Sequence, residues 1–428
     1  MFSTDANNTK EFACGLEVEA DLFAYRLEKT DSDNDRTRNL FERDYARILY
    51  SSSFRRLQGK MQLLGVDYTT FYRNRLTHSL EVAQIARTIA SGLGLKSPIV
   101  SEACALAHDI GNPPFGHSGE VILNKLANND SIGGYEGNAQ VIRIVRSLEK
   151  KYPQSKGLNL TVRTLLGLTK YFFTREENNK KYLYPDDYKV LNTEWLEKRA
   201  KSRRSIDVQI MDLSDEIAYA AHDLEDSLAM GYMSLGEILY EFQISSEYSP
   251  AHEGLRDIVK DVQKYAGDSS AVRSSEEYSS ILRRELTSRI VDRLVRDIKV
   301  VSKGADIHEE LGFGNYKLLS EGLKKLVFRS LLRKRNVQLY EKMGDKVIMG
   351  LYEVYCDKKF NKEGLLLPVE YRNTSRECEL KRSIIDYISG MMDAFAIKEY
   401  KKYYGSNSLD SLYPVKSKEC SERGYEDP

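Results

Sequence analysis

The feature that most constrains the fold is a helical spacing of apolar residues in a chain with few helix breakers. Residues 206–230 are the clearest case, because their apolar side chains recur every three or four positions and therefore share one face. The positions expected to face inward are Leu213, Ile217, Ala220, Ala221 and Leu224. Nine of the 428 residues are proline, and long stretches are rich in Leu, Glu, Lys, Arg and Ala, which favour helices. Strand-like alternation is scarce, so the sequence predicts an all-α bundle.

Three shorter helices are predicted earlier in the chain. Residues 74–91 place apolar side chains at roughly helical intervals and lead into Gly92 and Gly94, where a helix would stop. Residues 99–107 form a second, more apolar helix. A third helix, residues 117–127, follows two consecutive prolines, which interrupt any helix before it.

Polar segments separate these helices from the rest of the chain. The stretch 171–204 is rich in charged and amide side chains and is expected to be an exposed excursion. Residues 240–285 mix Ser, Glu, Asp and Tyr and are interpreted as a hinge or an insertion. The tail beyond Leu409 is expected to fray.

Charge and cysteine content exclude several classes of protein. Lys+Arg and Asp+Glu both number 64, so the global field gives no general argument for nucleic acid or an anionic membrane. Five cysteines are scattered without a CxxC pair, which argues against zinc fingers and for reduced thiols in a cytosol. The N-terminus lacks a signal-like pattern, and no apolar run approaches the roughly 18 residues of a membrane helix. We therefore expect a soluble, cytoplasmic protein with no membrane partner.

Three of the six histidines fall within forty residues. His78 lies on the predicted helix 74–91, and His108 with Asp109 ends an apolar stretch that runs through a Gly and two Pro into His117. Neutral imidazoles and carboxylates are the ligands of hydrolytic divalent metal centres. A helix end that leads into a glycine loop can make an adjacent His and Asp converge. The sequence therefore predicts a metal site with His78, His108 and Asp109.

A fourth ligand is expected from the predicted helix 206–230. Spacing of four residues stacks Asp215, Tyr219 and Asp223 on one helical face, which also carries His222. Such a stripe indicates either a lined pocket or a solvated acidic face. The carboxylates that this helix offers are Asp212, Asp215, Glu216, Asp223, Glu225 and Asp226.

A second candidate pair lies on the predicted helix 117–127. His117 and Glu120 are three residues apart, so the carboxylate can orient the imidazole and raise its pKa for general acid or base catalysis. The alternative is a surface hydrogen bond without a catalytic role.

Six sequence blocks carry a resemblance to a known family. Residues 54–62 read FRRLQGKMQ, 74–82 read NRLTHSLEV and 107–117 read AHDIGNPPFGH. Shorter blocks follow in register, and these are EGNAQ at 136–140, DLSDEIAY at 212–219 and DYISGMMD at 386–393. In this order the blocks resemble the deoxynucleoside triphosphate triphosphohydrolases of the HD superfamily. The resemblance extends from about residue 36 to about residue 396.

This resemblance implies an HD-domain helical bundle with additional helices on both sides of it. Residues 1–35 would be an N-terminal extension, and residues 36–235 would form the metal-dependent catalytic core. Residues 236–400 would complete the core and supply subunit contacts, and residues 401–428 would be a C-terminal tail.

The resemblance also assigns roles to individual residues. The implied metal ligands are His78, His108, Asp109 and Asp215. The implied catalytic residues are His117, Glu120 and Glu136. The implied substrate contacts are Arg55, Gln62, Arg75, Asn112, Tyr219 and Asp223. Gln62 and Tyr219 would read the deoxyribose, and Arg75 suits a phosphate because a guanidinium binds two oxygens at once.

The implied reaction is metal-dependent hydrolysis of a deoxynucleoside triphosphate, with dGTP as the leading substrate, to deoxynucleoside and inorganic tripolyphosphate. The cofactor would be Mn²⁺ or Mg²⁺, while Fe²⁺, Ni²⁺ or Zn²⁺ also suit a His/Asp site. Relatives form tetramers or hexamers, so a homo-oligomer is expected. Some relatives respond to a regulatory dNTP and others to single-stranded DNA, and both are possible partners.

Two other interpretations fit parts of the sequence. Another HD enzyme that hydrolyses a nucleoside monophosphate or a cyclic nucleotide would need the same ligands, but the blocks around Gln62 and Glu136 favour a triphosphate. A regulatory module with an inactive metal site could bind nucleic acid through the basic clusters 198–204 and 333–335. The complete ligand set argues against this module.

Overall fold

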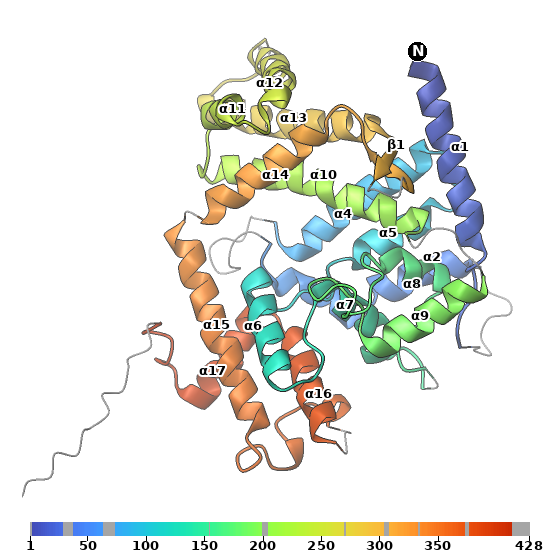
Figure 1. Cartoon of the computed structure of the whole chain (residues 1–428). Helices are drawn as coiled ribbons and strands as arrows, with labels where there is room; N and C mark the ends of the chain where they lie inside the picture. Colours follow the sequence, from blue (N-terminus) through green and yellow to red (C-terminus); the bar gives the residue numbers. More distant parts are fainter. Residues whose placement is uncertain are drawn as a thin grey trace, which may run out of the picture.

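The chain is largely helical, as Figure 1 shows for the computed structural model. The structure describes residues 2–28, 37–62, 73–153, 155–198, 204–268, 271–303, 308–332, 334–372 and 376–412. Within these ranges the strands are limited to one antiparallel pair, so the all-α fold class is confirmed.

The four predicted helices are present, with ends within two residues of the prediction. They are α4 (Arg75–Gly92), α5 (Pro98–Ala107), α6 (Gly116–Asn129) and α10 (Ile206–Ala229). Helices α4, α5 and α10 pack against one another. The five positions predicted to face inward on α10 are all buried. Gly94 adopts a left-handed backbone just beyond α4, as expected for the glycine that ends a helix.

The remaining elements surround these helices. In the first half they are α1 (Phe2–Asp21), α2 (Leu40–Leu49), α3 (Ser52–Arg56), α7 (Gly137–Arg143), α8 (Val162–Leu168) and α9 (Pro185–Glu197). In the second half they are α11 (Leu235–Ile244), α12 (His252–Gly267), α13 (Ser275–Arg296), α14 (Lys317–Leu332), α15 (Arg335–Cys356), α16 (Glu377–Ser389) and α17 (Asp393–Tyr404). Strands β1 (Ile298–Lys303) and β2 (His308–Phe313) pair antiparallel, with Ile298 opposite Phe313.

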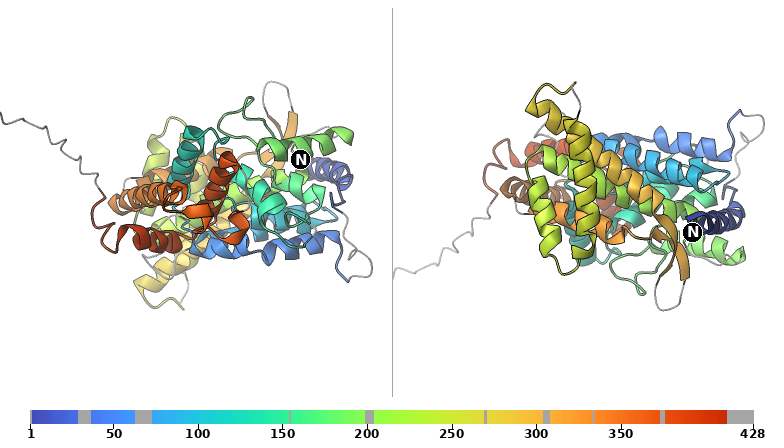
Figure 2. Two further views of the ribbon diagram at one scale, coloured as in Figure 1. Left: turned by 90° about the horizontal axis from the view of Figure 1, so that it is seen from below. Right: turned by 90° about the horizontal axis from the view of Figure 1, so that it is seen from above.

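Two hydrophobic cores hold these helices together. The larger core joins α4, α5 and α10 to the N-terminal helices on one side and to α11–α14 on another. The smaller core lies between α6, α15, α16 and α17. Figure 2 shows α11–α13 on one side of the molecule and α15–α17 on the opposite side. Helix α6 therefore links the central helices to the C-terminal part.

Helix α1 is tied to the body of the fold by buried charges. Glu17, 3% exposed, accepts hydrogen bonds from the backbone N–H groups of Lys96 and Ser97 at 2.8 and 2.9 Å. It also faces Arg163, which is fully buried and forms a further ion pair with Asp207 at 2.9 Å. The predicted N-terminal extension thus contains a packed helix. Residues 1 and 29–35 of this extension lie outside the described ranges.

Two expectations about the polar segments need correction. The stretch 171–204 is not simply an exposed excursion, because it contains α9 and the buried side chains of Tyr182, Tyr184 and Leu191. The segment 240–285 is mostly helical, and apolar side chains of α12 and α13 pack into the larger core, which does not fit a hinge. The alternative interpretation of this segment, an insertion, stays a prediction. The sequence patterns also missed the hairpin of β1 and β2, whose strands have six residues each.

Some expectations fall partly outside the described residues. Of the basic clusters, residues 199–203 and 333 lie outside them, as do residues 413–428 of the predicted tail. Its first residues, 401–404, belong to α17. Among the helices of the described part, none combines the length and apolar character needed to cross a bilayer.

Candidate metal centre

Three predicted ligands from three helices converge on one point. His78 lies in the first turn of α4, His108 follows the last residue of α5, and Asp215 lies in the middle of α10. Their ligand atoms lie within 4.8 Å of one another. Asp215 Oδ1 is 3.2 Å from His78 Nε2 and 3.5 Å from His108 Nε2. Ligand bonds of about 2.1 Å place neighbouring ligand atoms at about such separations.

His108 is oriented as a metal-ligating histidine usually is. His108 Nδ1 lies 2.6 Å from the carbonyl oxygen of Ala105, so Nδ1 carries the proton and the lone pair of Nε2 faces the other ligands. That Nε2 atom is buried and has no hydrogen-bond partner. Such an orphaned lone pair beside a carboxylate fits a bound cation.

Asp109 lies beside this group rather than at its centre. Its Oδ1 is 3.6 Å from His108 Nε2, and its Oδ2 accepts a bond from Arg75 at 2.5 Å. The amide of Asn112 also donates to Asp109. Burial raises the pKa of Asp109, but Arg75, His108 and His78 together outweigh burial and leave that pKa below its usual value. Asp109 is therefore an ionised carboxylate next to the three convergent ligands, and its role as a fourth ligand stays a prediction.

The structure distinguishes among the acidic residues of α10. Asp212 pairs with Lys170 and Arg204, at 2.7 and 2.9 Å. Glu225 and Asp226 both pair with Arg73. Glu216 points toward α14, and both oxygens of the buried Asp223 lack a hydrogen-bond partner. Of the six candidates, Asp215 alone joins the histidines.

Lys170 is a site residue that the sequence patterns missed. Its Nζ lies 2.7 Å from Asp212 and 3.5 Å from Asp215 Oδ2, just after α8. Burial raises the pKa of Asp215, but His108, His78 and Lys170 together hold it well below its usual value. No spacing in the sequence could reveal this lysine, because the fold alone brings residue 170 to α10.

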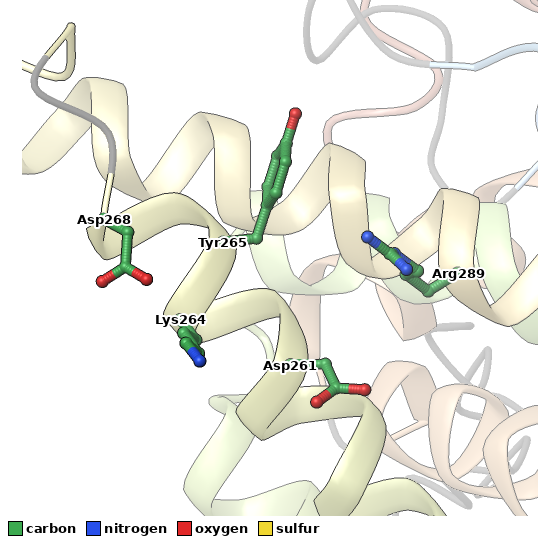
Figure 3. A pocket seen from close by; sticks show the side chains of 5 residues that line it. All are labelled: Asp261, Lys264, Tyr265, Asp268 and Arg289. Carbon is green, nitrogen blue, oxygen red and sulfur yellow. The ribbon is translucent and has the colours of Figure 1, made fainter.

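A pocket opens beside Asp215. Its volume is about 700 Å³, and Lys170, Asp215 and Tyr219 line it on the side of the metal ligands. Tyr248 and side chains of α14, among them Lys325, line it elsewhere. A second hollow of about 430 Å³ lies between α12 and α13. Figure 3 shows that its side chains diverge, with Tyr265 pointing away from Asp261. Of these two, the pocket at Asp215 borders the candidate metal ligands.

The predicted catalytic pair lies in the first turn of α6. His117 is 78% exposed, and its Nδ1 is 3.6 Å from Glu120 Oε2. Glu120 raises the pKa of His117, and Glu120 itself accepts the backbone N–H of Gly137 at 3.0 Å. A Cβ atom at Gly116 would lie 3.6 Å from Arg75 Nη2. The turn that presents His117 is therefore adjacent to the Arg75–Asp109 pair.

The other predicted site residues differ in their surroundings. Glu136 caps α7 and accepts a hydrogen bond from Lys181 at 2.7 Å. The Tyr219 ring lies 5.1 Å from that of His78. Gln62 is 8% exposed, and its Oε1 has no hydrogen-bond partner. Arg55 is exposed on α3, so nothing yet ties it to the metal ligands.

Comparison with known proteins places this site in a class. Residues 75–219 match the HD domain, and residues 316–402 match the phosphohydrolase-associated domain. Fold, ligands and both matches define an HD-domain phosphohydrolase.

Two relatives make the assignment more specific. The chain is 55% identical to the deoxyguanosinetriphosphate triphosphohydrolase-like protein 2 of Vibrio cholerae over 389 residues, which cover 91% of this chain and 94% of the relative. It is 36% identical to the deoxyguanosinetriphosphate triphosphohydrolase-like protein of Leptospira interrogans over 375 residues, covering 84% and 88%. The chain therefore belongs to the deoxyguanosinetriphosphate triphosphohydrolase-like family. The resemblance inferred from the sequence blocks is confirmed.

Proposed function

We propose that this protein hydrolyses a deoxynucleoside triphosphate, most readily dGTP, to a deoxynucleoside and inorganic tripolyphosphate. The observation that carries the proposal is the convergence of His78, His108 and Asp215 beside a pocket of about 700 Å³. A pocket of this size suits a nucleotide. The names of both relatives refer to deoxyguanosine triphosphate, which supports the choice of dGTP.

The proposed metal ligands are His78, His108, Asp109 and Asp215. Two imidazoles with carboxylates suit Mn²⁺ or Mg²⁺ and would also accept Fe²⁺, Ni²⁺ or Zn²⁺. A divalent cation bound there would supply a Lewis acid for the α-phosphate and lower the pKa of a water molecule. Side chains of the protein would position the triphosphate and transfer protons.

Two cationic side chains are placed to bind the phosphates. Arg75 is 7% exposed, and its Nε has no hydrogen-bond partner although its Nη1 donates to Asp109. Lys170 lines the pocket beside Asp215. A guanidinium binds two phosphate oxygens at once, whereas an ammonium acts as a point charge. Together they would offset the charge that develops on the phosphate.

His117 would be the proton donor to the departing 5′-oxygen. The carboxylate of Glu120 raises the pKa of His117, so the protonated imidazolium is more populated near neutral pH than for an isolated histidine. Glu120 is fixed in turn by the N–H of Gly137. The pair is thus suited to general acid catalysis.

Two side chains would discriminate against ribonucleotides. The Tyr219 ring packs on His78, and the buried Gln62 has an unpaired Oε1. Both would occupy the space that a ribose 2′-hydroxyl needs. GTP is therefore expected to be a poor substrate.

The test is incubation of the protein with each dNTP and with GTP, in Mg²⁺ or Mn²⁺, with the products separated by chromatography. The Asp215→Asn variant removes a ligand that faces both histidines. Glu225→Gln is the control, because Glu225 lies on the same helix but pairs with Arg73. Metal content and far-UV circular dichroism are measured for every variant.

The expected result is deoxyguanosine and tripolyphosphate from dGTP, lost in Asp215→Asn together with bound metal and retained in Glu225→Gln. Stepwise release of single phosphates, or hydrolysis of a monophosphate or cyclic nucleotide instead, would refute the proposed reaction. Equal activity of Asp215→Asn and the parent would refute the proposed site.

A further inference from the structure

A buried carboxylate in the C-terminal part holds two segments of the site. Asp393, the first residue of α17, is fully buried. Its Oδ1 accepts the backbone N–H of Phe115 at 3.0 Å, and its Oδ2 accepts the backbone N–H of Met61 at 3.0 Å. The hydroxyl of Tyr340 donates to the same Oδ2 at 3.1 Å. One carboxylate therefore fixes Met61, the residue before Gln62, and Phe115, two residues before His117. We call these hydrogen bonds to Asp393 the clasp.

The clasp acts where the backbone needs support. Phe115 has a φ of 62° and a ψ of 23°, a left-handed backbone conformation that residues other than glycine rarely adopt. Its ring is buried against Tyr340, with ring centroids 5.5 Å apart. This strained turn sets the direction in which α6 begins, and His117 lies in the first turn of α6. A backbone held in an unfavourable region persists because its surroundings fix it.

A buried lysine next to Met61 adds a second connection between the same parts of the chain. Lys60 is 1% exposed, and its Nζ donates to the carbonyl oxygens of Asn112 and of Ser389. Asn112 belongs to the loop that leads from Asp109 to Phe115, and Ser389 is the last residue of α16. Asp393 and Ser389 therefore both connect the C-terminal part to the segment 60–61 and the loop 112–115, Asp393 directly and Ser389 through Lys60.

We propose that Asp393 is a positioning residue of the hydrolytic site, which fixes the Phe115–Gly116 turn and thereby the approach of His117 to the substrate. Asp393 does not touch the substrate and acts through the two backbone N–H groups that it accepts. The catalytic consequence rests on the function proposed above, whereas the clasp itself does not.

The substitution Asp393→Asn tests this with almost no change in volume. A carboxylate can accept hydrogen bonds at both oxygens, but an amide places an NH₂ group at one of the two positions. In either orientation that group faces a backbone N–H, of Phe115 or of Met61, so one of the two bonds must be lost. The strained turn or the segment before Gln62 is then released.

Asp130→Asn is the matched control. Asp130 follows the last residue of α6, and its carboxylate accepts from Tyr352 and pairs with Lys381 at 2.5 Å. It therefore joins the same helix to the same C-terminal part, but at the end remote from His117. A role in stability alone would make the two variants alike.

The experiment combines steady-state kinetics, thermal unfolding, metal content and hydrogen exchange of the full-length protein. In Asp393→Asn we expect kcat for dGTP to fall at least tenfold with full metal content, measured below the unfolding transition. We expect exchange in peptides covering residues 61 or 115 to accelerate at least tenfold. In Asp130→Asn both quantities should stay within twofold of the parent.

The outcomes separate this inference from the proposed function. A folded Asp393→Asn variant with parental kcat, or with parental exchange at both segments, would overturn the inference, as would an equal loss of kcat in Asp130→Asn. If the parent hydrolyses no dNTP, the proposed function is wrong, and exchange still tests the clasp. Should Asp393→Asn not fold, Tyr340→Phe removes one of the three donors while keeping the ring, and exchange at residue 61 or 115 should rise at least threefold.

Discussion

Substitution of Gly119 by alanine should damage the site through a single backbone contact. Gly119 lies in the first turn of α6, and an added Cβ would lie 2.0 Å from the carbonyl oxygen of Pro114 and 3.1 Å from Ile348 Cδ1. A carbon atom and a carbonyl oxygen in contact are about 3.3 Å apart, so the helix or the loop must retreat by about 1.3 Å. Ile348 Cδ1 is the end of a side chain and can shift, but Pro114 O belongs to the backbone of the loop that leads from Asp109 to Phe115.

The size of the expected effect follows from that displacement. A misplacement of about 1 Å can lower a rate by about 100-fold, so kcat for dGTP should fall by about that factor. Overpacking of this kind should also lower the free energy of unfolding by about 1 to 3 kcal/mol, measured by urea denaturation. Gly15→Ala on α1 is the control, because a Cβ there meets no atom within 4 Å. A Gly119→Ala protein with parental kcat and parental stability would refute the reasoning.

Two further predictions concern protonation and the N-terminal helix. Glu120→Gln removes the group that most raises the pKa of His117. The protonated imidazole is the proposed acid, so activity should decline as pH rises through that pKa, and in the variant the decline should begin at lower pH in a profile of kcat against pH. An unmoved alkaline limb would exclude His117 as the acid. Glu17→Ala leaves the N–H groups of Lys96 and Ser97 without an acceptor and takes one carboxylate from Arg163. The free energy of unfolding should fall by about 2 to 4 kcal/mol, and a loss below about 0.5 kcal/mol would show that α1 is not held this way.

Local signals predicted the helices around the site, and the reason is physical. Helix α10 carries an apolar stripe over many turns, and α4 is capped by Asn74, whose side chain accepts the N–H of Thr77. Such periodicity and caps act within a few residues, so a sequence shows them directly. The hairpin of β1 and β2 was missed because two strands of six residues give little alternation to detect.

The buried part of the segment 171–204 was misjudged for a different reason. Its charged residues dominate the composition, but Tyr182 and Tyr184 bury their rings against each other, with centroids 6.2 Å apart. Tyrosine carries a large apolar surface and a single polar group, so a polar stretch that contains it can still pack. Charge content alone therefore overestimated exposure there.

The candidate site was predictable to the extent that its residues are close in sequence or share a helix. His108 and Asp109 are adjacent, and one stripe of α10 carries Asp215 and Tyr219. Spacing could not separate Asp215 from the neighbouring carboxylates, because the choice depends on which of them the fold brings to the two histidines. Asp212 forms an ion pair with Lys170, and Asp226 forms an ion pair with Arg73. These partners come from distant parts of the chain and become neighbours only in the fold.

The contacts of Asp393 and Phe115 show how the two matched domains depend on each other. The HD match, residues 75–219, contains every convergent ligand, and Asp393 lies within the phosphohydrolase-associated match, residues 316–402. A fragment that ended at residue 235 would keep the ligands but would lose the acceptor for the Phe115 N–H. It would also expose the face of α6 that packs in the smaller core, where Phe115 and Leu123 are buried. The left-handed turn before His117 would then have neither its hydrogen bond nor its packing partner Tyr340. The C-terminal helices therefore complete the packing of α6 and hold the turn that precedes His117.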